Sequence, residues 1–228
     1  MAVAKPNSQY NVAKPDSFAI RLAHKQRLVM FDRWLKECGV RPEDTILDVG
    51  ATSDTVYSSS NYLEAWYPHK DRIVACGIDD ASFLEDTYPG LRFVQADGLN
   101  LPFESQSFDV VHSSAVLEHV GSLANQARFV AECARVARRS FFLTTPNRWF
   151  PVEFHTSLPL LHWLPKSVFR GLLRPTRLGF FSDEANLNLM AASELTAIGN
   201  GLEGWSTKVV MIPLAGFTSN IILVGKRT

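Results

Sequence analysis

The chain has 228 residues, of which 46% are hydrophobic and 20% charged, as in an ordinary globular domain. Lys+Arg and Asp+Glu both total 23, so charge gives no reason to expect nucleic acid as a partner. The three cysteines form no CxxC pair or Cys/His cluster, so we expect no metal site, and their odd number favours a reducing, cytoplasmic location.

Strands and helices alternate through the first two thirds of the chain. Residues 1–16 are polar and lack the apolar core of a signal peptide, so we expect a flexible arm. No apolar run is long enough to span a membrane. Ser17 can cap a helix that runs to Gly39, and Asn61 can cap a short helix over 61–68 with Glu64 three residues on. A further helix is predicted over 123–138, and strands are predicted over 44–49, 72–79, 91–97, 107–114 and 140–145.

Apolar strands separated by helices indicate a parallel sheet covered on both faces. The tail differs, because the strand-like runs 205–214 and 219–227 follow each other without a helix, so the last strand should be antiparallel. We expect a single domain with an N-terminal helix (17–39), a cofactor-binding core (44–148), a helical lid inserted at 149–201 and a C-terminal strand pair (202–228).

Acidic residues follow the first three strands. In an open parallel sheet, ligands bind outside the carboxyl ends of the strands. Asp48 and Gly50 end the first strand, Asp79 ends the second, and Asp97 with Gly98 ends the third. A carboxylate after the second strand suits the two hydroxyls of a ribose, and one after the third suits an exocyclic amino group. Each acid alone is equally compatible with a solvated loop.

The segments "LDVG", "GIDD", "VQADGLNLPFESQSFDVVHSSAVLEHV" and "ECARVARRSFFLTTPN" resemble the class I S-adenosylmethionine-dependent methyltransferases over residues 44–146. The run "TTPNRWFPVEFHTSLPLLHWLP" resembles a branch of methyltransferases found near cell-envelope glycan genes. The resemblance implies a Rossmann-like fold with seven strands and S-adenosyl-L-methionine as cofactor. It places Gly50 near the methionine part, Asp79 on the ribose and Asp97 at the adenine. The full expected cofactor-binding set is Asp48, Gly50, Ala51, Thr52, Ser53, Asp54, Asp79, Asp80, Asp97, Gly98, Leu99 and Ser113.

The first loop, "GATSDT", lacks the glycines of a dinucleotide fingerprint. S-adenosylmethionine has no phosphate to cradle, so its loop tolerates side chains. Asp48 or Asp54 can bind the ammonium, and Thr52 and Ser53 can donate to the carboxylate. The alternative is a decayed site in a domain that only binds a partner.

Histidines are the candidate general bases for methylation of a hydroxyl. His112 is expected at the end of the fourth strand, His119 on the following turn, and His155 at the start of the lid. For His112 and His119, a structural or pocket-lining role is the competing interpretation. Three residues near the lid are expected to bind substrate, namely Asn147, Trp149 and Glu153.

Lys166, Arg170 and Arg174 recur every four residues and therefore share one helical face. A basic amphipathic helix within 158–177 can contact the inner face of a membrane peripherally. The alternative is that its apolar face packs on the sheet and its basic face meets water.

The sequence thus predicts an S-adenosylmethionine-dependent methyltransferase. The expected reaction is O-methylation of a small molecule, a saccharide or a lipid-linked glycan. Two other readings stay open. One is a non-catalytic partner-binding domain with a degenerate pocket. The other is an NAD-dependent oxidoreductase, which should carry G-x-G-x-x-G where this chain has "GATSDT".

Overall fold

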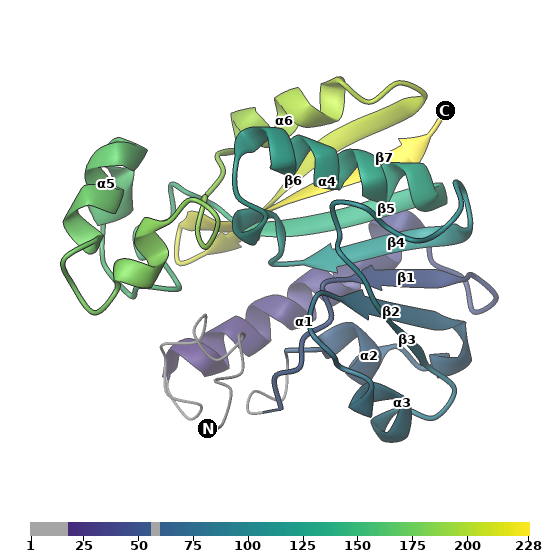
Figure 1. Ribbon diagram of the computed structural model, residues 1–228. Coiled ribbons are helices and arrows are strands. Elements are labelled where there is room, and N and C mark those ends of the chain that lie inside the picture. The colour runs from purple at the N-terminus through teal and green to yellow at the C-terminus, as the bar shows by residue number, and fades with distance from the viewer. Residues whose placement is uncertain (1–17, 56–59) are drawn as a thin grey trace.

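The computed structural model describes residues 18–55 and 60–228, so the arm and the Ser17 cap lie outside the described residues. A seven-stranded sheet in the order β3-β2-β1-β4-β5-β7-β6 forms the centre of the molecule (Figure 1). Its strands are β1 (Ile46–Val49), β2 (Ile73–Gly77), β3 (Arg92–Gln95), β4 (Phe108–Ser114), β5 (Ala137–Pro146), β6 (Trp205–Leu214) and β7 (Phe217–Arg227).

Strand pairing follows the prediction. β1 pairs in parallel with β2 and β4, β2 with β3, and β4 with β5. β7 runs antiparallel to both β5 and β6, as expected for the last strand. β5 begins three residues before the predicted 140–145, where Ala137 pairs with Phe108 of β4, and ends one residue after it, where Pro146 pairs with β7. The Rossmann-like fold with an antiparallel last strand is therefore confirmed.

Helices cover both faces of the sheet (Figure 1). Buried side chains form one core cluster between the sheet and α4 and another around α1 and α2. The helices are α1 (Phe18–Cys38), α2 (Tyr62–Trp66), α3 (Phe83–Thr87), α4 (Leu123–Val136), α5 (Lys166–Leu173) and α6 (Ala192–Asn200), with 3₁₀ turns η2 (Lys70–Arg72), η3 (Leu117–His119), η4 (Leu161–Trp163) and η5 (Gly179–Ser182). None of the helices in 18–55 and 60–228 is long and apolar enough to cross a bilayer.

The expected cap of α2 is wrong. Asn61 precedes α2, but its side chain makes no capping bond and turns to Thr52 instead. Glu64, the expected third residue of a capping box, is buried beneath the sheet edge.

The lid stands beyond the carboxyl ends of the parallel strands, where Figure 1 shows α5 away from the sheet. It has a small core of its own, which explains how so short a helix is held. α6 instead packs against β6 and β7, so the part that stands off the sheet ends before α6. The lid core consists of Phe169, Leu173, Phe181, Leu187 and Leu189.

Candidate active site

The first loop crosses the end of β2 at a distance that only glycine permits. The backbone N–H groups of Gly50 and Ala51 both donate to the Cys76 carbonyl, at 2.7 and 2.9 Å. Gly50 has φ +108°, and a Cβ there would lie 2.1 Å from Cγ2 of Val116. A Cβ on Gly77 would lie 2.1 Å from the Ala51 carbonyl oxygen. Two glycines therefore bring the ends of β1 and β2 together, although neither belongs to a G-x-G-x-x-G run.

Side chains close the rest of this loop. The Thr52 N–H donates to Oδ1 of Asn61 and the Thr52 carbonyl accepts from Nδ2, both at 2.9 Å. The Asp54 N–H donates to Oγ1 of Thr52, and Ser60 donates to Oδ2 of Asp54 at 2.8 Å. The amide of Asn61 thus satisfies the Thr52 backbone as a neighbouring strand would. Thr52 and Asp54 shape the loop, and their expected contacts with the cofactor stay predictions.

Asp79 lies two residues beyond β2, at the carboxyl edge of the sheet. Its Oδ2 atom is buried and has no hydrogen-bond partner. A buried carboxylate oxygen without a donor costs free energy, so such an atom commonly awaits a ligand. Its neighbour Asp80 instead accepts a hydrogen bond from the Ser82 N–H at the start of α3, which lowers the pKa of the Asp80 carboxyl.

Asp97 is exposed beyond β3. Its Oδ1 accepts from the Leu99 N–H at 2.9 Å, which fixes the turn and leaves the carboxylate facing solvent. Gly98 is required by packing, because a Cβ there would lie 2.5 Å from the ring of Phe129. Leu99 packs against the core cluster under α4.

Asp48 and His112 form a buried hydrogen-bonded pair. The Asp48 carboxylate bonds to Nδ1 of His112, whose Nε2 pairs with the Tyr62 hydroxyl at 2.8 Å. Burial raises the pKa of Asp48 to about 6 and lowers the pKa of His112 to about 4. Burial, and next to it the charge of Asp48, also raise the pKa of Glu64. Both nitrogens of His112 are occupied, so we assign it a structural role and drop it as a base.

Ser113 is buried in β4 on the opposite face from His112, since side chains alternate along a strand. Nothing in the structure tests its expected contact with the cofactor.

His119 and His155 meet at the lid, although 36 positions separate them in the sequence. Their rings are perpendicular, with centroids 4.8 Å apart. Nδ1 of His119 donates to the Asn186 carbonyl at 2.7 Å, and Nδ1 of His155 donates to Oε1 of Glu153 at 2.7 Å. The buried carboxyl of Glu118 completes the group, with one oxygen 3.9 Å from Nε2 of His119.

The charges in this group differ from residue to residue. Burial and, to a smaller extent, the neighbouring His155 lower the pKa of His119 to about 3, so His119 is neutral near pH 7. Burial alone would lower the pKa of His155, but the Glu153 carboxylate outweighs it and raises that pKa. Burial alone would raise the pKa of Glu153, but His155 and backbone N–H donors lower it to about 2. Glu153 and His155 therefore form an ion pair that orients the His155 ring.

The expected substrate residues are placed differently from one another. Asn147 donates through Nδ2 to the Thr218 carbonyl and accepts from the Trp149 N–H, so its side chain ties β5 to the strand pair. Glu153 is buried and orients His155 rather than facing a substrate. Trp149 is exposed and lies against the Arg148 guanidinium.

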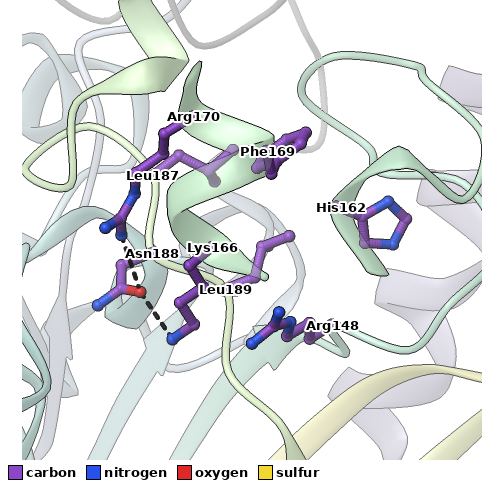
Figure 2. Close-up of a pocket in the computed structure, with 8 residues that line it drawn as sticks. All are labelled: Arg148, His162, Lys166, Phe169, Arg170, Leu187, Asn188 and Leu189. Carbon is purple, nitrogen blue, oxygen red and sulfur yellow. Dashed lines mark hydrogen bonds between the residues drawn. The ribbon is translucent and has the colours of Figure 1, made fainter. Parts of the chain in front are cut away.

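A pocket within the lid gathers three cations. Figure 2 shows Lys166 and Arg170 reaching the side-chain oxygen of Asn188, at 2.8 and 3.3 Å, with Arg148 also in the wall. Burial lowers the pKa of Lys166, Glu194 raises it, and the charges of Arg148 and Arg170 lower it again. The other lining residues are His162, Phe169, Leu187 and Leu189.

Asn188 joins this pocket to the turn that carries Glu118 and His119. Its N–H donates to the Glu118 carbonyl, its Nδ2 to the Gly121 carbonyl, and its own carbonyl accepts from Gln126, each at 2.7 Å. No specific sequence signal pointed to Asn188, and Asn61 was expected as a helix cap rather than as the residue that holds the Thr52 backbone. Their only signal is a polar amide beside apolar or hydroxyl residues, which many loops share.

The comparisons with known proteins agree with this arrangement. The family described as "Methyltransferase domain" matches residues 54–143, which run from the first loop through β5. Over these residues the chain is similar to the methyltransferase domain family. A Mycobacterium tuberculosis protein named "Probable S-adenosylmethionine-dependent methyltransferase" is 41% identical over 81 residues, and a Mycolicibacterium smegmatis protein of like name is 36% identical over 81 residues.

These matches cover 34% of this chain in both cases, and 28% and 30% of the relatives, so the chain spans under a third of their length. Solved structures extend the likeness in fold to nearly the whole chain. A magnesium protoporphyrin IX methyltransferase from Synechocystis PCC 6803 with bound SAH has a TM-score of 0.60 at 17% identity, covering 97% of this chain and 92% of its own. The PH0226 protein from Pyrococcus horikoshii OT3 has a TM-score of 0.60 at 13% identity, covering 96% and 95%.

Proposed function

We propose that this chain transfers a methyl group from S-adenosylmethionine to a hydroxyl of its acceptor. The observation that carries the proposal is the buried, unpartnered Oδ2 of Asp79, beside the Gly50–Gly77 crossing at the carboxyl edge. Asp79 would accept from the ribose hydroxyls, and the exposed carboxylate of Asp97 from the adenine amino group. The sulfonium cofactor supplies an activated methyl group, and the residues of the chain supply position and proton transfer.

We propose His119 as the general base that takes the proton directly from the acceptor hydroxyl. Its Nδ1 donates to a carbonyl, so Nε2 carries the lone pair, and its lowered pKa keeps it neutral. The Glu153 carboxylate raises the pKa of His155 and so favours its protonated form, which would stabilise a developing alkoxide. Val116 directly precedes η3 and contacts Gly50, which supports a position for His119 near the cofactor loop.

The lid pocket supports an acceptor that carries an anionic group. Arg148, Lys166 and Arg170 line it, where Lys166 also pairs with Glu194 and Arg170 with Glu184, and guanidinium and ammonium groups favour phosphate or carboxylate. A small acidic molecule, an acidic saccharide and a lipid-linked glycan with a phosphate bridge all share that chemistry.

Peripheral membrane contact fits the outer surface of the lid. Seven of the thirteen exposed large apolar residues among the described positions lie between 149 and 172. Lys166 and Arg170 instead point inward to Asn188, so the exposed side of α5 is formed by apolar Val168 and Leu172. This arrangement differs from both expectations for the helix, which were a basic face on a membrane and a basic face in water with the apolar face on the sheet. We propose that apolar insertion, rather than basic attraction, would drive this contact.

Isothermal titration separates the alternatives. S-adenosylmethionine and its demethylated product should both bind with one site per chain. Binding of NAD alone would favour the oxidoreductase, and binding of none of the three would favour the partner-binding domain. Methyl transfer from labelled cofactor to acidic hydroxylated acceptors then tests the reaction, and transfer that survives His119→Ala in a folded variant would contradict the direct base.

A further inference from the structure

Three side chains beside the proposed acceptor site converge on one point. Glu118, His119 and His155 each offer one ligand atom, and these atoms all lie within 4.8 Å of one another. Glu118 and His119 lie on η3, and His155 comes from the start of the lid, so the group joins the core to the lid. We propose that these residues bind one divalent transition-metal ion, with Zn²⁺ as the favoured ion.

Each of the three side chains is oriented from behind. Glu153 fixes Nδ1 of His155, and the Asn186 carbonyl fixes Nδ1 of His119, so both Nε2 atoms are the ones presented. Metal-binding histidines commonly donate their other N–H to a carboxylate or a backbone carbonyl in this way. Thr145 donates to Oε2 of Glu118 at 2.8 Å and so leaves Oε1 for the shared point.

The Glu118 carboxyl is the independent sign of a missing ligand. Its side chain is fully buried, and Oε1 has no hydrogen-bond partner. A buried carboxylate oxygen is costly when it is left without a donor or a cation. A structural role for Glu118 would need only the bond from Thr145, and would not explain an unsatisfied oxygen 3.9 Å from an imidazole nitrogen.

The ligand types select the metal. Two imidazoles and one carboxylate suit Zn²⁺ and similar transition ions, whereas Mg²⁺ and Ca²⁺ prefer oxygen ligands alone. With metal–ligand bonds of about 2.0–2.2 Å, tetrahedral ligand atoms lie about 3.4 Å apart, so the three side chains must close by about 1 Å. Three protein ligands leave a fourth position open, as in catalytic zinc sites.

The role of the ion rests on the proposed function, although its binding does not. An acceptor hydroxyl in the open position would lose its proton more readily, because the bound cation stabilises the alkoxide. His119 and His155 would then act as ligands rather than as bases. The expectation of no metal site was drawn from the cysteines, and these ligands are spread from residue 118 to 155 with no regular spacing.

Metal binding can be measured without cofactor or acceptor, which keeps it separate from methyl transfer. Chelator-treated full-length protein is titrated with Co²⁺ by visible absorption and with Zn²⁺ by calorimetry. We expect one ion per chain, lost in His119→Ala and His155→Ala and unaffected in the control His69→Ala. Glu153→Gln should weaken binding about 10- to 100-fold, because it removes only the group behind His155.

A thermal-unfolding series gives a second readout. Zn²⁺ should raise the Tm of the wild type and of His69→Ala, and leave that of His155→Ala unchanged. If either alanine variant fails to fold, the metal affinity of the isosteric Glu153→Gln variant tests the site instead. The proposal is overturned if folded wild-type protein binds no stoichiometric Co²⁺ or Zn²⁺. The proposal is also overturned if Glu153→Gln and a folded His119→Ala or His155→Ala variant bind the metal ion as tightly as the wild type does.

Discussion

Replacement of Asp79 by alanine tests the cofactor site most directly. The Oδ2 atom of Asp79 is buried and unpartnered, so binding of a ribose hydroxyl would supply its first hydrogen bond. A hydrogen bond to a charged group contributes about 1.5–3 kcal/mol. At about 1.4 kcal/mol per factor of ten, Asp79→Ala should weaken S-adenosylmethionine binding by about 10-fold to about 150-fold.

The same geometry predicts that Asp79→Ala does not lower the stability of the unliganded protein. Alanine removes a carboxylate oxygen that has no partner, so the unliganded Tm of Asp79→Ala should stay level or rise. Loss of affinity without loss of stability distinguishes a ligand-binding carboxylate from one that holds a loop together. Asp86→Ala on α3, which removes an exposed carboxylate nearby, is the matched control and should change neither quantity.

Calorimetric titration of both variants with S-adenosylmethionine and its demethylated product supplies the affinities. Circular dichroism and thermal unfolding show that each variant is folded. An unchanged affinity in folded Asp79→Ala would refute the assignment of the ribose to the end of β2. A fall in Tm of several degrees without ligand would instead show that Asp79 has a structural partner.

Three further outcomes follow from the structure. Asn61→Ala removes both hydrogen bonds to the Thr52 backbone and should weaken cofactor binding about 3- to 10-fold, at about 0.5–1.5 kcal/mol for the lost bonds. An unchanged affinity in calorimetry would mean that the loop holds its shape without these bonds. Burial raises the pKa of all three cysteine thiols, so none should react with a thiol reagent in the native state at pH 8 and all three should react after unfolding; rapid native labelling would contradict their burial. Val168→Ser with Leu172→Ser should reduce sedimentation with anionic liposomes more than Arg174→Ser does, and equal losses would indicate basic attraction instead.

The fold could be predicted from the sequence because its strands are apolar and evenly separated. β1, β4 and β6 lie within one or two residues of their predicted bounds, and the antiparallel tail follows from two strand-like runs without a helix between them. The errors lie where a tertiary contact decides the local structure. Asn61 precedes a helix like a cap, yet its amide bonds across the loop to Thr52, which no local rule predicts.

The site was predictable in part, because parallel strands bring their carboxyl ends to one edge. That rule places Asp79 and Asp97 correctly at the edge. It cannot tell which side chains a strand end buries, and Asp48 and His112, both expected in the site, form a buried hydrogen-bonded pair. The meeting of His119 with His155 depends on how the lid folds back, and Asn186 and Asn188 make that contact.

The glycine-poor first loop shows how side chains replace backbone flexibility. A phosphate-binding loop needs several glycines because many N–H groups must approach one anion. Here only Gly50 and Gly77 sit where a Cβ would collide, and the amide of Asn61 and the hydroxyl of Ser60 hold the remainder. A loop fixed by side chains pays its ordering entropy on folding rather than on binding. "GATSDT" therefore has the features of a preorganised loop for a ligand without phosphates, since a decayed loop would have no need of four mutually satisfied polar groups.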